Sequence, residues 1–427
     1  MHSPTTAPLS SASRPIPTSS EVDPLVDSLT NGEIRAIDAV REQIARLTAV
    51  HQAANCVAAW NPQAEDEAAA LDAQFDVGGA VGPLHGVPIT VKDWIDVAGL
   101  PCTGGEVAHR DRVPTRDATV VARLRAAGAV VIAKTTVRVD SDLWGPVHHP
   151  ADPTRSPGGS SSGEAAAVGG GGSVLGIGSD SGGSLRVPAA WCGVATLKPS
   201  AGRVPTTGHF PRVGERVDGR TQIGPLTASV GTLRTVLAII AGPDGVDAGV
   251  APVPLGDPDD TSVESLRVGW FLGDDAHDTT PAARDAVERA VRHLESLGVR
   301  NVGAIDLHLD EALDITLRYW KRASGRLEGW DVEAQLMDWD RYRSRMLRTL
   351  ADVDVVVMPV TPTTAPFHRA METSDYIFTM PASLTGAPSV VVPMGFEAGL
   401  PVAVQVVADR WRDDIALRVA AAIEDAS

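Results

Sequence analysis

Cysteine is scarce in this chain. Its 427 residues include three cysteines, Cys56, Cys102 and Cys192, and no two of them have CxxC spacing. An odd number of widely spaced cysteines excludes a disulfide framework and offers no zinc-binding motif. We therefore expect neither structural disulfides nor a cysteine-held metal.

Long apolar runs and an excess of positive charge are missing as well. No apolar run reaches the roughly 18 residues that a membrane-spanning helix needs. Because 54 Asp and Glu outnumber 37 Lys and Arg, the formal net charge is −17. A negative surface potential disfavours nucleic acids and anionic membranes as partners. We expect a cytoplasmic protein that binds neither of them.

The N-terminal segment lacks the apolar core of a secretory signal. It begins MHSPTTAPLSSASRPIPTSS, a stretch rich in Ser, Thr and Pro. A signal peptide would need an apolar region of roughly 7–15 residues here. We predict a disordered tail over residues 1–24 and, because no linker or fixed-period repeat divides the remainder, one large domain over 25–427.

Helical and strand patterns alternate along that domain, as is typical of an α/β fold. Apolar spacing predicts helices over about 32–49, 117–126, 164–168, 280–298 and 413–424, and strands over 86–91, 129–133, 174–177, 266–271, 354–360 and 389–393. In the first strand Val87, Ile89 and Val91 share one face, so Thr90 and Lys92 point to the other.

The most informative segment is 156–205, which holds two Gly-Ser clusters. Ser160 and Ser184 each lie beside glycines, whose freedom lets the backbone approach a ligand closely. Backbone N–H groups of Ser181, Gly182 and Gly183 could point at a developing negative charge, as an oxyanion hole requires. The alternative is that these serines belong to ordinary turns.

A nucleophilic serine needs a base, and no histidine is placed for that role by a sequence motif. The chain has 11 histidines, but no GxSxG elbow accompanies a suitable acid and histidine. His148, His149 and Asp152 could suggest a metal site, yet they match no known ligand spacing. Lys92 is the leading candidate, because a lysine buried in an α/β core can be neutral near pH 7. The alternative is an ordinary surface lysine.

Four sequence blocks extend this pattern along the chain. They are GVPITVKDWIDVAGLPCTGG around Lys92, SPGGSSSGEAAAVGGG around Ser160, GSDSGGSLRVPAAWCGVATLKPSAGRVP around Ser184, and MPASLTGAPSVVVPMGFEAGLPVAVQVVA near the C-terminus. In this order they resemble the blocks of the amidase signature family of Ser–Ser–Lys hydrolases. The resemblance covers about residues 25–426 and is strongest over 86–205. It implies a single large α/β domain with a central mixed β-sheet covered by helices on both faces.

The resemblance also implies a role for each matching residue. Ser184 would be the nucleophile, Ser160 a bridging serine that the family holds in a cis peptide, and Lys92 the base. The N–H groups of Ser181, Gly182, Gly183 and Ser184 would form the oxyanion hole, with Ser161, Asp180 and Arg186 as hydrogen-bonding support. No cofactor or metal is implied.

Three departures from the family pattern stand out. Ser162 replaces a glycine in the first cluster, and the loop must adjust if that position needs a positive φ. Ser179 stands where threonine is usual, a change that we expect to be harmless. The region between the nucleophile block and the C-terminal block is compact, which would reshape the substrate cleft.

That compact region concentrates aromatic residues in a chain with only 4% of them. It contains Tyr319, Trp320, Trp330 and Trp339. One interpretation is ordinary helix packing; the other is the wall of a cleft for a bulky or aromatic substrate group.

Together these features predict a hydrolase that cleaves amide-type C–N bonds through an acyl-enzyme on Ser184. Amides, anilides and carbamates are all compatible substrates, and some ester hydrolysis is expected. The first alternative is a component of a glutamyl-tRNA-type amidotransferase working with partner chains. A second is a non-catalytic anion-binding protein, although the glycine loops lack the GK[ST] ending of a phosphate loop. We expect a monomer or homodimer.

Overall fold

A computed structural model describes residues 22–213, 219–323, 325–326 and 329–425. The predicted tail, residues 1–24, lies outside these ranges except for its last three residues, which begin helix α1 (Val22–Thr30). The other helices are α2 (Ala36–Ala54), α3 (Ala64–Gly78), α4 (Thr119–Ala126), α5 (Ser162–Gly169), α6 (Arg186–Cys192), α8 (Val230–Ile240), α9 (Pro281–Ser296), α10 (Leu309–Ala323), α11 (Trp330–Thr349), α12 (Met380–Thr385) and α13 (Asp413–Glu424).

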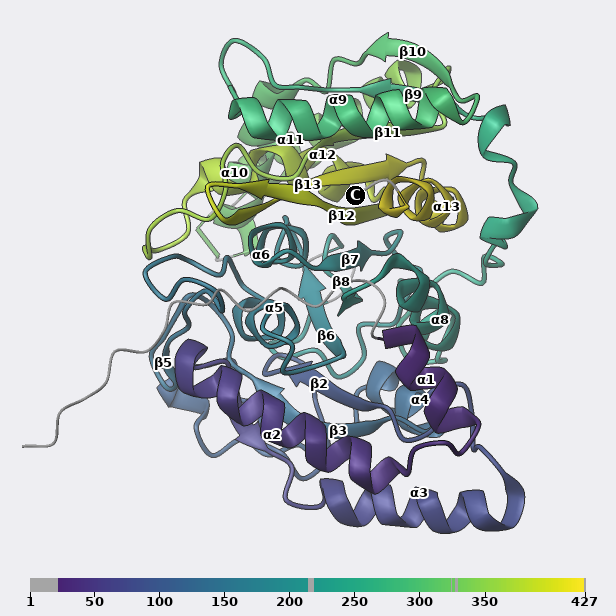
Figure 1. Cartoon of the computed structure of the whole chain (residues 1–427). Helices are drawn as coiled ribbons and strands as arrows, with labels where there is room; N and C mark the ends of the chain where they lie inside the picture. Colours follow the sequence, from purple (N-terminus) through teal and green to yellow (C-terminus); the bar gives the residue numbers. More distant parts are fainter. Residues whose placement is uncertain (1–21, 214–218, 324, 327–328, 426–427) are drawn as a thin grey trace, which may run out of the picture.

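One large mixed sheet runs through the molecule, in the order β1-β3-β2-β6-β8-β7-β12-β13-β11-β9-β10. In Figure 1 its strands are stacked from β10 at the top to β3 near the bottom. The strands are β1 (Val57–Trp60), β2 (Pro88–Lys92), β3 (Val130–Thr135), β6 (Leu175–Asp180), β7 (Ala195–Lys198), β8 (Gln222–Thr227), β9 (Arg267–Trp270), β10 (Arg300–Ala304), β11 (Val355–Pro359), β12 (Ser389–Glu397) and β13 (Leu400–Ala408). A separate two-stranded sheet joins β4 (Asp140–Ser141) to β5 (Gly145–Pro146).

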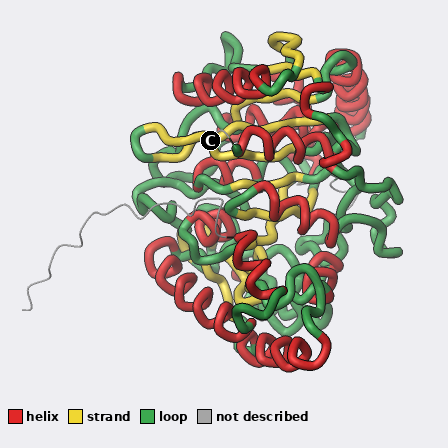
Figure 2. The backbone as a smooth tube through the Cα atoms, turned by 45° about the vertical axis from the view of Figure 1, so that its right-hand side comes forward, coloured by secondary structure: helices red, strands yellow, loops and turns green. Residues whose placement is uncertain are grey.

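Helices cover both faces of this sheet (Figure 2). Side chains of α4, α8, α9 and α13 share one hydrophobic cluster with alternate strand residues such as Val355 and Val357. The intervening residues Val356 and Met358 belong to a second cluster on the opposite face. Burial of alternate residues on two faces is what a sheet between two helix layers requires. The predicted α/β domain with a mixed sheet flanked by helices is confirmed.

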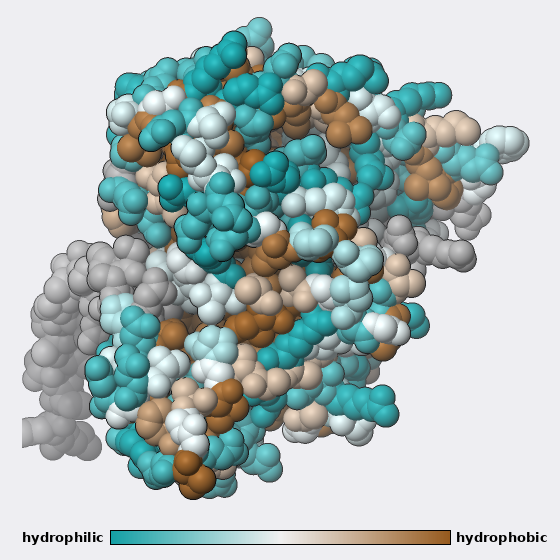
Figure 3. Space-filling view, turned by 90° about the vertical axis from the view of Figure 1, so that its right-hand side faces the viewer, coloured by the Kyte–Doolittle hydropathy of each residue, from teal (hydrophilic) through white to brown (hydrophobic). Residues whose placement is uncertain are grey.

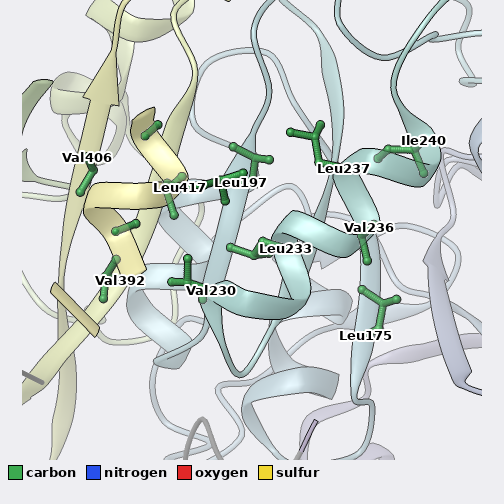
Figure 4. Close-up of a cluster of buried hydrophobic side chains, with 14 of the residues drawn as sticks. Leu175, Leu197, Val230, Leu233, Val236, Leu237, Ile240, Val392, Val406 and Leu417 are labelled. Atoms are coloured by element: carbon green, nitrogen blue, oxygen red, sulfur yellow. The ribbon is translucent and has the colours of Figure 1, made fainter. Parts of the chain in front are cut away.

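Helix α8 illustrates how the core is built from helical spacing. Val230, Leu233, Val236, Leu237 and Ile240 recur every three or four residues and are all buried. They pack beside strand residues in the cluster that Figure 4 shows. Burying one such side chain contributes about 1.5–3 kcal/mol.

Most predicted elements occur near their expected positions, and α2 shows why a boundary can be wrong. The prediction began this helix at residue 32, using the capping-box spacing after Thr30, but it begins at Ala36. The carboxylate of Asp72 in α3 accepts hydrogen bonds from the N–H groups of Ala36 (2.8 Å) and Ile37 (3.1 Å). A cap supplied 36 residues away cannot be predicted from local spacing.

The candidate site lies at the carboxyl ends of two central parallel strands. Strands β2 and β6 pair from Ile89↔Leu175 to Val91↔Ile177, so their carboxyl ends lie together. The predicted alternation in β2 is confirmed, because Ile89 and Val91 enter the hydrophobic core while Thr90 bonds to Glu164 of α5. Lys92, the last residue of β2, therefore faces α5 as well.

No helix in the described ranges is both long and apolar enough to cross a membrane. Figure 3 shows one face of the molecule, on which hydrophilic and hydrophobic residues are mixed. Large apolar side chains are also exposed, among them Trp330, Met337 and Phe367, as on most globular proteins.

Candidate active site

Lys92 is the centre of a buried hydrogen-bonded group. Its side chain is fully buried. Lys92 Nζ lies 2.9 Å from both Ser160 Oγ and Ser161 Oγ. It also lies 3.2 Å from Ser179 Oγ and 3.3 Å from the Ser179 carbonyl oxygen. The structure thus brings together Lys92 and two of the serines that sequence analysis selected.

This environment disfavours the charged form of Lys92. Burial lowers the pKa of Lys92 well below its ordinary value of 10.5, and Arg138 adds to the lowering. The negative charges of Asp180 and Glu164 oppose it. A buried amine whose pKa is lowered in this way can accept a proton near neutral pH.

Ser160 lies in the loop that leads into α5. The Gly159–Ser160 peptide bond is cis, and the Ser160 side chain is half-buried. Among the contacts that hold this loop, the Tyr376 hydroxyl donates to the Gly159 carbonyl (3.0 Å), and the Ser161 N–H donates to the Ser184 carbonyl (3.2 Å). The loop of Ser160 and the loop of Ser184 are therefore direct neighbours.

Ser162 stands where the family pattern has glycine, and the loop needs no adjustment to hold it. Ser162 is the first residue of α5 and is not among the residues with positive φ. Its hydroxyl donates to the Gly158 carbonyl at 2.6 Å. A serine fits here because the helical conformation at this position is open to every L-residue.

Ser184 lies on the tight turn between β6 and α6, and a buried ion pair anchors that turn. Both Asp180 and Arg186 are fully buried. Arg186 Nε and Nη2 donate to the two oxygens of Asp180 at 3.0 and 3.1 Å. Arg186 also donates to the Thr379 carbonyl and to Ser383 Oγ. Although burial opposes its ionisation, Arg186 holds the pKa of Asp180 at about 2.

The Asp180 carboxylate binds one of the four N–H groups predicted for the oxyanion hole, so that part of the prediction is wrong. Gly183 N–H donates to Asp180 Oδ1 at 2.7 Å, so it does not point at a substrate. Within the described chain, no hydrogen bond is formed by the N–H groups of Ser181, Gly182 or Ser184. Three of the four predicted donors therefore remain available. Gly183 has φ +131°, and a side chain there would collide with Thr379.

Of the four aromatic residues proposed for the cleft, Trp320 alone is shown beside the nucleophile turn. A Cβ on Gly182 would lie 3.5 Å from the Trp320 indole. Tyr319 is only 1% exposed, and the Arg220 guanidinium lies 3.5 Å from the centre of its ring. Because neighbouring helix positions point about 100° apart, Tyr319 faces the core while Trp320 faces the site.

The remaining two aromatics are elsewhere. Trp330 begins α11 and is 83% exposed, so the described residues form no cleft wall around it. Trp339 is half-buried; its indole N–H donates to the Leu384 carbonyl, and it lines a separate cavity of about 270 Å³. The expectation of a cleft wall is therefore wrong for Tyr319 and Trp330.

Sequence reasoning missed Glu164, which is fully buried behind Lys92. Its carboxylate accepts hydrogen bonds from Thr90 (2.6 Å) and Thr135 (2.7 Å). Burial raises the pKa of Glu164 to about 7, against the opposing effect of these hydrogen bonds. The one signal was a charged residue inside the small-residue run GEAAAVGGGG.

The alternative metal site around His148 and His149 is not formed. His148 Nδ1 lies 2.9 Å from the Pro153 carbonyl oxygen and His149 Nε2 lies 2.8 Å from that of Trp191. Among the residues with described positions, no three His, Cys, Asp or Glu side chains are grouped to hold a metal ion.

Comparison with known proteins agrees with this geometry. The chain matches the family model described as Amidase over residues 38–329 and 312–417. It is 32% identical to one component chain of the glutamyl-tRNA(Gln) amidotransferase of Chloroflexus aurantiacus, over 92% of this chain and 93% of that protein. It is also 32% identical to indoleacetamide hydrolase of Bradyrhizobium diazoefficiens, over 93% of this chain and 84% of that protein.

A solved structure is similar over nearly the whole fold. It is that of 6-aminohexanoate cyclic dimer hydrolase complexed with substrate, with a TM-score of 0.82 and 26% identity. The match covers 95% of this chain and 96% of that chain. From the family match and the extent of these similarities, we conclude that the chain belongs to the amidase signature family of enzymes that act on amide-type C–N bonds.

Proposed function

We propose that this protein is a stand-alone hydrolase that cleaves amide-type C–N bonds through an acyl-enzyme on Ser184. One observation carries the proposal: a fully buried Lys92, with a lowered pKa, lies 2.9 Å from Ser160 Oγ next to the Ser184 turn. A serine nucleophile requires a base, and a neutral buried amine supplies one.

The proton relay follows from this arrangement. Neutral Lys92 accepts the proton of Ser160, and Ser160 accepts the proton of Ser184 as Ser184 Oγ attacks the substrate carbonyl carbon. The tetrahedral intermediate then collapses, the C–N bond breaks, and the relay run in reverse delivers the proton to the leaving amine. Attack by water on the acyl-enzyme releases the acid and regenerates Ser184.

The oxyanion of the tetrahedral intermediate needs hydrogen-bond donors. In the proposal they are the N–H groups of Ser181, Gly182 and Ser184, which have no other acceptor in the described structure. Loss of one such donor costs about 3 kcal/mol in enzymes that use them. The Thr379 hydroxyl supports this turn, because it donates to the Gly182 carbonyl at 2.6 Å.

The proposed substrates are amides, anilides or carbamates, since each has a carbonyl to attack and an amine to expel. Esters should also react, because an alcohol leaves more easily. Two similar proteins carry names of amide hydrolases, indoleacetamide hydrolase and 6-aminohexanoate cyclic dimer hydrolase. Trp320 beside Gly182 would contact the substrate near the reacting carbonyl.

The test is covalent labelling combined with a substrate panel. A serine-directed fluorophosphonate should label the purified chain, and Ser184→Ala should abolish both labelling and turnover of aryl amides, aliphatic amides and carbamates. Ser374→Ala, at an exposed serine, is the matched control and should keep both. Activity should survive chelators. Equal labelling of the Ser184→Ala variant would refute the proposal.

A second candidate is a role as one component of an amidotransferase, favoured by the 32% identity to a chain of glutamyl-tRNA(Gln) amidotransferase. That function would require partner chains. The purified chain would then show no hydrolysis of the panel until partners were added, whereas the stand-alone hydrolase turns over alone.

A further inference from the structure

One buried side chain outside the proposed machinery is linked to Lys92 by hydrogen bonds. His209 is 7% exposed, and its Nε2 lies 3.0 Å from Ser179 Oγ. Ser179 Oγ in turn lies 3.2 Å from Lys92 Nζ. The other ring nitrogen, Nδ1, lies 3.0 Å from the Pro211 carbonyl oxygen.

The Pro211 carbonyl fixes the direction of one of these hydrogen bonds. A carbonyl oxygen only accepts, so His209 Nδ1 carries a hydrogen and donates it to Pro211. In a neutral imidazole the second nitrogen is then an acceptor. When the His209 ring is neutral, the Ser179 hydroxyl donates to Nε2, and the lone pairs of Ser179 Oγ face Lys92.

Ser161 presents an acceptor to Lys92 in the same way. Its hydroxyl donates to the Ser179 carbonyl at 3.2 Å, and its oxygen accepts from the Ser179 N–H at 3.4 Å and from Lys92 Nζ at 2.9 Å. A neutral amine has two N–H donors and one lone pair. Ser161 Oγ and the two oxygens of Ser179 accept from these donors, and the lone pair of Lys92 is left for the hydroxyl of Ser160.

We propose that His209 is a positioning residue that, through Ser179, keeps the lone pair of Lys92 directed at Ser160. Without the acceptor on His209, the Ser179 hydroxyl can turn and donate to Lys92 itself. It then competes with Ser160 for the only lone pair, and the relay loses its first proton transfer. The inference rests on the proposed Lys92–Ser160–Ser184 relay.

Two variants of His209 separate the two hydrogen bonds. In His209→Asn the side-chain amide can still donate to Pro211 but does not reach Ser179. In His209→Gln the longer side chain can place its amide oxygen where Nε2 was. We expect kcat and the rate of Ser184 labelling to fall about 10- to 100-fold in His209→Asn, with KM within about twofold of the wild type, and to stay within about threefold in His209→Gln.

A double-mutant cycle tests whether His209 acts through Ser179. Ser179→Ala should lower kcat, and adding His209→Asn to it should cause no further loss, because the hydroxyl that His209 orients is gone. Ser179→Thr keeps a hydroxyl and should stay active. If the fold-losses in kcat of the two single variants multiply in the double variant, the inference is overturned. It is also overturned if His209→Asn is labelled at the wild-type rate.

A measurement on the unmodified protein covers the case in which His209→Asn does not fold. ¹⁵N NMR of the imidazole should show a hydrogen on Nδ1 and none on Nε2; a hydrogen on Nε2, in the opposite tautomer or in a protonated ring, would overturn the inference. Failure of the proposed function is a separate result, since the wild type would then not be labelled at Ser184 at all.

Discussion

Lys92 Nζ lies 2.9 Å from Ser160 Oγ, although the two residues are 68 positions apart in the sequence. Lys92 is at the buried end of a central strand, and Ser160 is the half-buried residue of an otherwise buried loop over 156–161. This contact connects the dry interior, where an amine loses its charge, to the surface at which a substrate can arrive.

Replacing Lys92 should stop catalysis without unfolding the protein. In Lys92→Met the chain keeps an apolar side chain of similar length but has no group to accept the Ser160 proton. We expect turnover to fall by about a thousand-fold or more. Circular dichroism and the melting temperature would check the fold, and Lys321→Met, at an exposed lysine, should remain active. Near-full activity of Lys92→Met would contradict the relay.

The rate should fall as the pH becomes acidic. Lys92 acts as a base only when neutral, and burial lowers the pKa of Lys92 well below 10.5. Activity is therefore expected above that lowered pKa and is lost as the pH falls through it. A profile of kcat/KM against pH would measure this, and a flat acid limb would exclude a titrating lysine as the base.

Replacing Asp180 with Asn should destabilise the fold. Because the variant leaves Arg186 buried without its ionised partner, we expect a loss of about 3–5 kcal/mol in the free energy of unfolding. The pKa of Asp180 is about 2 in the folded chain, below its ordinary 3.8. The stabilisation is thus complete above pH 3.8 and lost as the pH falls through 2. Urea unfolding at pH 7 would measure it; unchanged stability would contradict the structural role of the pair.

Glu164 should make stability depend on pH in the opposite sense. Burial raises its pKa from 4.5 to about 7, so the folded chain binds this proton more tightly than the unfolded chain. Its contribution is complete below pH 4.5 and is lost as the pH rises through 7, by at most about 3 kcal/mol. In thermal unfolding between pH 4.5 and 8, the wild type should lose stability relative to Glu164→Gln as the pH rises, whereas other buried groups such as Lys198 titrate in both proteins. Parallel curves would argue against it.

Trp320 should affect bulky substrates more than small ones. It lies beside Gly182, whereas Trp330 is 83% exposed. We expect Trp320→Ala to lower kcat/KM about tenfold for aryl amides, with a smaller change for short aliphatic amides. Trp330→Ala is the matched control and should change neither; equal losses on both substrates in Trp320→Ala would mean that the indole does not select the substrate.

Local chemistry was sufficient to predict much of the fold. Helix α9 begins at Pro281, beside the predicted start at 280, and the Thr280 side chain accepts a hydrogen bond from the Ala283 N–H. Helix α13 has the predicted bounds, Asp413–Glu424. Such elements follow from the sequence because the deciding contacts span only a few residues.

The sequence by itself also determined which residues could carry the chemistry. Alternation in β2 put Lys92 on the face away from the apolar core, and glycine-rich spacing marked Ser160 and Ser184. Tertiary structure alone decided the rest. The burial of Lys92 and the hydrogen-bonded chain from His209 through Ser179 to Lys92 are set by contacts between separate segments. A pKa and the direction of a hydrogen bond depend on such neighbours, and the order of residues does not specify them.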